Sequence, residues 1–262
     1  ARREELTDEQ WSLIKHLFEK DDVIQTRGRP PRSAREVLNG VLWILRSGAR
    51  WCDMPARFPP YQTCHRRFQQ WNKDGTLKLV LETLAEDLHS RGKFDLSECF
   101  IDGTFIVAKK GASEWKDQAG KGTKLMAVAD SAGLPVAIYA ESAAPHEVRL
   151  VEQTLCARFT DQRPEKLIGD KAYDSDPLDE RLARFEIELI APHKTNRKKP
   201  KTQDGRKMRR YKRRWKIERL FAWLQNFRRV LVRFDYHDAN YLGFVHLACI
   251  VILLETIFEI AS

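Results

Sequence analysis

The segment that most constrains the fold runs from residue 97 to residue 142, where three stretches rich in strand-forming residues follow one another. They are SECFIDGTFIVAKK (97–110), KLMAVAD (124–130) and LPVAIYAES (134–142), and the turn DSAG joins the last two. Strand and helix patterns then alternate as far as IELIAP at 187–192. Consecutive strands followed by strand–helix alternation predict an α/β fold whose sheet mixes antiparallel and parallel strands.

The first 92 residues show helical repeats of apolar residues separated by short breaks. They predict four helices, at 6–20 with Thr7 as N-cap, 34–48, 61–75 and 76–92. A helix, a connection and a second helix rich in Gln, His and Arg are typical of a helix-turn-helix DNA reader. A plain helical bundle with a solvated polar face fits the same pattern. The side chains that would reach base edges are Gln62, His65, Arg66 and Gln69.

The composition break near Gly92 divides the chain. We predict a helical DNA-binding domain at 1–93 and an α/β domain at 94–262, which the resemblance given below implies is catalytic. Within the second domain, about 194–210 is expected to be a basic loop. The segment 206–229 is expected to form one helix, and the apolar stretch 242–260 a buried helix, since it is short for a membrane span of about 20 apolar residues.

Positive charge is concentrated near the C-terminus. The chain carries a net charge of +9, but residues 194–233 hold seventeen Lys or Arg against Asp204 and Glu218, which is +15 and leaves −6 elsewhere. Such a local basic stripe is typical of a surface that binds nucleic acid. In addition, RGRPPR (27–32) is similar to the core of a minor-groove AT-hook, so Arg27 and Arg29 are further candidates.

Two acids fall on predicted strands. Asp102 lies in an otherwise apolar run, where an unpaired charge is costly. Asp170 ends the short strand KLIGD, at the position where α/β sheets usually bind ligands. A third acid on a helix crossing the sheet would complete a site for Mg²⁺, with Mn²⁺ as a substitute, because these ions prefer carboxylate oxygens. Two such ions can cleave a phosphodiester.

Glu218 is the one acid in the basic helix predicted at 206–229. At 100° per residue, it shares a stripe about 60° wide with Tyr211, Arg214 and Gln225. One interpretation is an ion pair with Arg214 or Arg219, which at a surface contributes about 0–1 kcal/mol. The other is that Glu218 is the third metal ligand and that Tyr211 and Arg214 contact phosphate.

Two further sequence features argue against a nucleotide-binding P-loop and against a disulfide framework. AGKGTK (119–124) lacks the P-loop pattern, so it is interpreted as a loop that brings Lys121 and Lys124 near phosphates. Five cysteines without a CxxC pair favour a reducing cytoplasm over a disulfide framework.

Together, FIDGT, SAAPHEV, IGDKAYDSDPLD, IELIAPHK and RRWKIERLFAWLQNFRR resemble bacterial insertion-sequence transposases of family five. These belong to the DDE class with an RNase H-like core. The resemblance implies that Asp102, Asp170 and Glu218 are catalytic, metal-binding acids that hold two ions. Relatives carry a Tyr-x2-Arg-x3-Glu-x6-Lys signature, in which the final Lys is Gln225 here. Arg228 and Arg229 are candidates for its role.

The implied function is binding and hydrolysis of the insertion sequence's ends, followed by joining of the 3′-hydroxyls to target DNA. The expected partners are double-stranded terminal inverted repeats, target DNA and, by class analogy, a second subunit, with no membrane. The expected location is the bacterial cytoplasm, at the nucleoid. A non-cleaving DNA-binding regulator and an RNase H-like nuclease are the alternatives. The candidate DNA contacts are Arg27, Arg29, Gln62, His65, Arg66, Gln69, Lys121, Lys124, Arg197, Lys198, Lys199, Tyr211, Arg214, Arg228 and Arg229.

Overall fold

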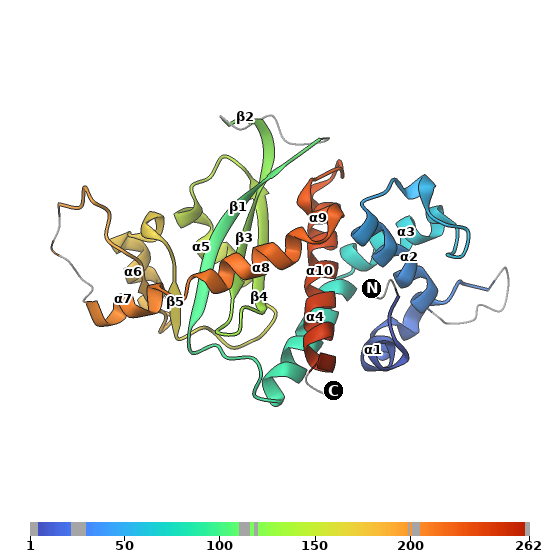
Figure 1. The fold of residues 1–262 in the computed structure, drawn as a ribbon, viewed down its shortest axis with the longest axis horizontal. Helices are drawn as coiled ribbons and strands as arrows, with labels where there is room; N and C mark the ends of the chain where they lie inside the picture. Colours follow the sequence, from blue (N-terminus) through green and yellow to red (C-terminus); the bar gives the residue numbers. More distant parts are fainter. Residues whose placement is uncertain are drawn as a thin grey trace. The chain divides into compact units, whose positions relative to one another are not determined.

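The computed structural model describes residues 5–21, 30–109, 116–117, 120–198, 200 and 205–259. The chain forms two compact units. One, here called the helical unit, comprises residues 1–84, 109–111 and 224–262, and the other, the α/β unit, comprises residues 85–108 and 112–223. Figure 1 shows the elements of each unit along the chain.

The helical unit is built from amphipathic helices around an aromatic core. Trp71 is fully buried and meets the Phe18 ring edge-on at 5.0 Å, and Phe68 packs on Phe244 at 4.5 Å. Thr7 caps the first helix through a capping box with Gln10, which confirms the predicted N-cap. The helices are α1 (Asp8–Ile14), η1 (Lys15–Asp21), α2 (Ala34–Ser47), η2 (Trp51–Asp53), α3 (Tyr61–Lys73), most of α4 (Thr76–Ser90), α9 (Arg228–Leu231) and α10 (Asp238–Glu259).

The apolar helix α10 is long and apolar enough to cross a membrane by length and composition, but 72% of its most apolar window is buried inside the protein. It packs against α2, α3 and α9 of the same unit. It is therefore the core helix of the helical unit, as the sequence predicted. Residues 224–262 belong to the same compact unit as the N-terminal helices. The compact units therefore differ from the predicted division at residue 93, and that division stays a prediction about function.

The α/β unit contains a mixed sheet. In it β4 (Pro135–Ser142) pairs with β3 (Gly120–Ala129), β3 pairs antiparallel with β1 (Cys99–Val107), and β1 continues in parallel to β5 (Lys166–Ile168) and β6 (Glu188–Ile190). The short β2 (Lys116–Asp117) pairs with the start of β3. The α/β prediction with both strand directions is confirmed. Helices α5 (Glu147–Cys156) and α6 (Asp176–Ala183) connect the strands, with η3 (Lys171–Tyr173) after β5.

The prediction of a single helix at 206–229 is wrong. The structure has α7 (Gly205–Tyr211), a turn at 212–214, α8 (Trp215–Gln225) and then α9. Like charges four residues apart destabilise a helix, and Arg210, Arg213 and Arg214 turn instead toward acids of the sheet. Helix α8 crosses the face of the sheet (Figure 1), and the Lys216 ammonium lies over the Phe100 ring on β1.

Candidate active site

Asp102 and Asp170 stand at the same level of the sheet because their strands are parallel neighbours. The last paired residues of β1 and β5 are Phe100 and Ile168. Asp102 and Asp170 each follow two residues later. Beyond Ile168 the chain leaves the sheet, and the Asp170 carboxylate caps η3 by accepting a 2.7 Å hydrogen bond from the Ala172 N–H. The two acids therefore meet where β5 ends, as the sequence predicted from the position of KLIGD.

Arg214 joins Glu218 to this pair. Its Nη1 donates to Asp102 Oδ2 at 2.6 Å and its Nη2 donates to Glu218 Oε1 at 2.9 Å. The guanidinium also lies 5.9 Å from the Tyr211 ring centre. Although the predicted continuous helix is absent, the turn at 212–214 leaves Tyr211, Arg214 and Glu218 close together. The ion pair of Glu218 with Arg214 does not compete with a role beside Asp102, because Arg214 binds both carboxylates.

Asp102 is a partly buried carboxylate with other charged groups close to it. Burial raises its pKa above the ordinary value and the nearby Asp170 adds to this, while the Gly103 N–H and Arg214 oppose it. Closely spaced carboxylates in a partly buried place need a cation. Arg214 is that cation in this structure, on the side that faces Glu218.

The oxygen-only donor set of Asp102, Asp170 and Glu218 suits a hard divalent cation. In the described ranges, no three acid, His or Cys side chains gather closely enough to hold an ion.

A fourth acid, Glu147, lies at the same place and was missed from the sequence. It begins α5, and its Oε2 accepts a 3.1 Å hydrogen bond from the hydroxyl of buried Tyr173. Burial raises the pKa of Glu147, the Tyr173 hydroxyl and the Lys124 ammonium oppose this, and the charges of Asp102 and Asp170 add to the rise. The sequence signal was an acid in the first turn of a helix directly after a strand, which by itself is common.

Part of the basic segment is bound to acids and backbone carbonyls inside the α/β unit. Glu98, directly before β1, pairs with both Arg210, at 2.6 Å, and Arg213. Lys216 and Arg219 donate to the backbone carbonyls of Ser131 and Ala132. These bases hold α7 and α8 onto the sheet, so the +15 charge of the segment overstates the charge available to DNA.

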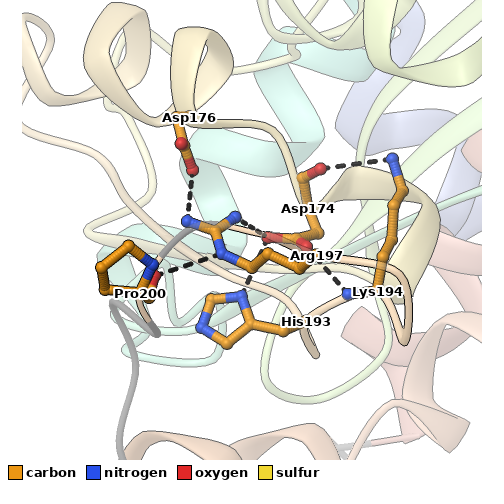
Figure 2. A network of polar contacts seen from close by, with 6 residues as sticks. All are labelled: Asp174, Asp176, His193, Lys194, Arg197 and Pro200. Carbon is orange, nitrogen blue, oxygen red and sulfur yellow. Dashed lines mark hydrogen bonds and ion pairs between the residues drawn. The ribbon is translucent and has the colours of Figure 1, made fainter.

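Arg197, a predicted DNA contact, belongs to a network of polar contacts shown in Figure 2. It donates to Asp174 at 2.8 Å and Asp176 at 2.6 Å, and its side chain is only 11% exposed. Asp174 also accepts from the Lys194 N–H and contacts His193 Nδ1. Although burial opposes it, these partners keep the pKa of Asp174 below its ordinary value.

This network anchors the first part of the basic loop. Ser175 is the N-cap position of α6, and the Asp174 carboxylate just before it is bound by the loop. Lys198 is exposed, as are Arg209 and Lys212 on either side of Tyr211. Within the described ranges, no acid pairs with any of these three bases.

The other predicted DNA contacts of the α/β unit are Lys121, Lys124 and Lys199. Lys124 on β3 donates its Nζ to the Pro145 carbonyl at 2.7 Å, which places the ammonium beside the start of α5. Lys121 belongs to β3, but its side chain lies outside the described residues, as does Lys199.

In the helical unit, α3 presents one polar face. Gln62, Arg66 and Gln69 are exposed and recur at helical spacing, and Gln70 and Lys73 extend the same face. His65 is different, because its ring packs 4.7 Å from Trp51 and burial lowers its pKa. The connection between α2 and α3 takes residues 48–60, longer than the three- or four-residue turn of a standard helix-turn-helix. Arg27 and Arg29 lie outside the described residues.

Arg228 and Arg229 are adjacent but have opposite environments. Arg228 is exposed, whereas Arg229 is buried and donates to Asp235 Oδ1 at 3.0 Å. The Arg229 guanidinium also lies 5.2 Å from the Phe244 ring centre. Of the two candidates to replace the missing Lys, Arg228 alone has its charge at the surface.

Two family models match this chain. One, described as "Putative transposase of IS4/5 family", matches residues 6–81, and the other, "Transposase DDE domain", matches residues 93–253. The chain is 34% identical over 135 residues, 51% of its length and 98% of the relative's, to "Putative transposase for insertion sequence element IS6501" of Brucella ovis. It is 29% identical over 149 residues, 54% of its length and 67% of the relative's, to the corresponding IS402 protein of Burkholderia cepacia.

Among solved structures, the piggyBac transposase synaptic complex with hairpin DNA matches with a TM-score of 0.45 and 12% identity. That match covers 92% of this chain and 63% of the piggyBac chain, and it adds nothing to the two family matches.

Proposed function

Because the chain belongs to the DDE transposases of insertion sequences, which use divalent metal ions, we propose that Asp102, Asp170 and Glu218 form its catalytic site. Membership also confirms the RNase H-like fold class, and the function is DNA transposition. The observation that carries the proposal is the common level of Asp102 and Asp170, joined through Arg214 to Glu218.

The three acids would hold Mg²⁺, or Mn²⁺ in its place, as a pair of ions. Ions bound there supply a water activated for attack on phosphorus and stabilise the departing 3′ oxygen. Hydrolysis frees a 3′-hydroxyl at the end of the element. That hydroxyl then attacks a phosphodiester of target DNA in the same site, forming one bond as the target's own 3′ oxygen leaves.

Arg214 has a role in each state of the site. Without DNA its guanidinium compensates Asp102 and Glu218. When a phosphate enters, the same planar fork suits two phosphate oxygens. Tyr211, under the guanidinium, is placed to contact a neighbouring phosphate.

DNA contacts would come from two places. In the α/β unit the exposed bases Lys198, Arg209 and Lys212 contact phosphates, and Lys121, Lys124 and Lys199 stay candidates. In the helical unit the α3 face of Gln62, Arg66 and Gln69 reads the terminal inverted repeats, with Arg228 and the candidates Arg27 and Arg29 on the backbone. Arg197, Arg229 and His65 are assigned to internal packing instead. A homodimer on DNA would hold two ends together in the cytoplasm, at the nucleoid.

The test is cleavage of DNA that carries the inverted repeats flanking the gene, in Mg²⁺ and in EDTA. Metal-dependent nicking at the repeat ends, followed by joining to a target plasmid, is expected. Binding of the repeats without nicking would favour a DNA-binding regulator. Cleavage of RNA or junctions without joining would favour an RNase H-like nuclease.

A further inference from the structure

The carboxylate of Glu147 lies against the backbone next to Asp102. A Cβ atom on Gly103 would stand 2.9 Å from Glu147 Cδ and 3.0 Å from Oε1. Such distances are closer than carbon and oxygen atoms normally approach, so the carboxylate fits here only because residue 103 is glycine. Glu147 is therefore placed in direct contact with the strand segment that carries Asp102.

A second contact ties the same carboxylate to Asp170. Tyr173 ends the η3 turn that Asp170 caps, and its hydroxyl donates to Glu147 Oε2 at 3.1 Å. The Tyr173 ring is buried against Gly169, where an added Cβ would stand 2.7 Å from the ring. Glu147 thus touches the chain next to both acids, from a third element of the α/β unit.

The contacts of the Glu147 side chain with Tyr173 and Gly103 do not require a charge. A glutamine at residue 147 would accept the same hydrogen bond from Tyr173 and fill the same space. A carboxylate adds a half-buried negative charge beside Asp102 and Asp170, and the mutual repulsion is costly unless a cation is present. The Lys124 ammonium, which also donates to the Pro145 carbonyl, offsets part of the Glu147 charge, and Arg214 lies on the side facing Glu218. The combined charge of Asp102, Asp170 and Glu147 is therefore compensated only in part within the protein.

We infer that Glu147 is a fourth acid of the catalytic site, and that its charge helps Asp102 and Asp170 hold a divalent cation. This rests on the proposed function, which supplies the cation. The family pattern of three acids does not include this residue, which comes from the first turn of α5.

The experiment is a Mn²⁺ titration of the full chain without DNA, with free Mn²⁺ followed by electron paramagnetic resonance. Glu147→Gln should weaken the tightest Mn²⁺ site by about tenfold or more, since one charge is lost a few ångströms from a doubly charged ion. Its thermal stability should be equal or higher, because repulsion is relieved.

The matched control is Glu141→Gln. Glu141 also accepts a hydrogen bond from a tyrosine hydroxyl, that of Tyr139 at 2.9 Å, but it lies near the end of β4, two strands away from β1. Its replacement should leave Mn²⁺ affinity unchanged. Tyr173→Phe removes the hydrogen bond and keeps the Glu147 charge, so it should bind Mn²⁺ far better than Glu147→Gln does.

Asp170→Asn separates this inference from the proposed function. Loss of binding in Asp170→Asn with wild-type affinity in Glu147→Gln would overturn the role of Glu147 and leave the three-acid site standing. Wild-type affinity in Asp170→Asn would instead remove the proposed site. Equal losses in Tyr173→Phe and Glu147→Gln would show that the hydrogen bond matters and the charge does not, which also overturns the inference.

Discussion

The sequence predicted two DNA-binding surfaces, the polar face of α3 and the basic segment around α7 and α8. Their side chains have opposite environments in the structure. On α3 the polar side chains point outward, free of the core beneath them. Around α7 and α8 many bases are bound to acids or carbonyls of the sheet. Charge in a sequence therefore becomes a DNA-binding surface only where the fold leaves it without an internal partner.

The largest expected effect separates chemistry from binding. Asp102→Asn or Glu218→Gln should reduce end cleavage by more than about 100-fold, because even outer partners of metal ligands cost about 10–100-fold. An α3 variant such as Gln62→Ala should cleave normally once DNA is saturating. Single-turnover cleavage at saturating end DNA measures both. Near-normal cleavage by Glu218→Gln would remove Glu218 from the site.

The next effect tests buried against exposed bases in neighbouring positions. Arg229→Ala leaves Asp235 buried without its partner and should lower the free energy of unfolding by about 3–5 kcal/mol. Arg228→Ala keeps the Cβ that packs on Gly48 and should leave stability nearly unchanged while weakening DNA binding. Urea unfolding of the two variants gives the comparison. Equal stability losses would mean that Arg228 is also structural.

A smaller effect concerns sequence reading by α3. Arg66→Ala or Gln69→Ala should each cost about 1–3 kcal/mol on inverted-repeat DNA if the side chain makes a bidentate base contact. Binding to scrambled DNA should change much less. Competition binding with both DNAs measures the difference. Equal weakening on the two DNAs would assign these residues to the phosphate backbone.

The smallest effect compares free with paired bases through salt. Each phosphate contact contributes about −0.9 to the slope of log K against log salt. Replacing Lys198, Arg209 and Lys212 together by Gln should therefore flatten the slope by up to roughly 3. The control replaces Arg197, Arg210 and Arg213, whose charges are already paired, and should flatten it less. A larger change in the control would reverse the assignment.

The sheet was predictable, and the three acids of the proposed site could be singled out, because local sequence patterns mark them. Asp102 is conspicuous in an apolar strand, Asp170 follows a short buried strand, and Glu218 is alone among bases. The level shared by Asp102 and Asp170 then follows from parallel pairing of β1 with β5.

What could not be predicted depends on contacts between distant segments. The helix breaks at 212–214 because Glu98 and Asp102, more than 100 residues earlier, attract Arg210 and Arg214. Arg197 is taken by acids of another segment, and Glu147 reaches the site only through the approach that Gly103 permits. Neither periodicity nor charge counting reports such pairings.

The central claim, that Asp102, Asp170 and Glu218 surround one metal position, is tested most directly by iron-mediated cleavage of the protein itself. Fe²⁺ with ascorbate and peroxide generates hydroxyl radicals at the metal site, and these cut nearby backbone. The account predicts fragments ending close to residues 102, 170 and 218, suppressed by excess Mg²⁺ and absent in Asp170→Asn. Cuts at other segments, or cuts that persist in Asp170→Asn, would contradict it.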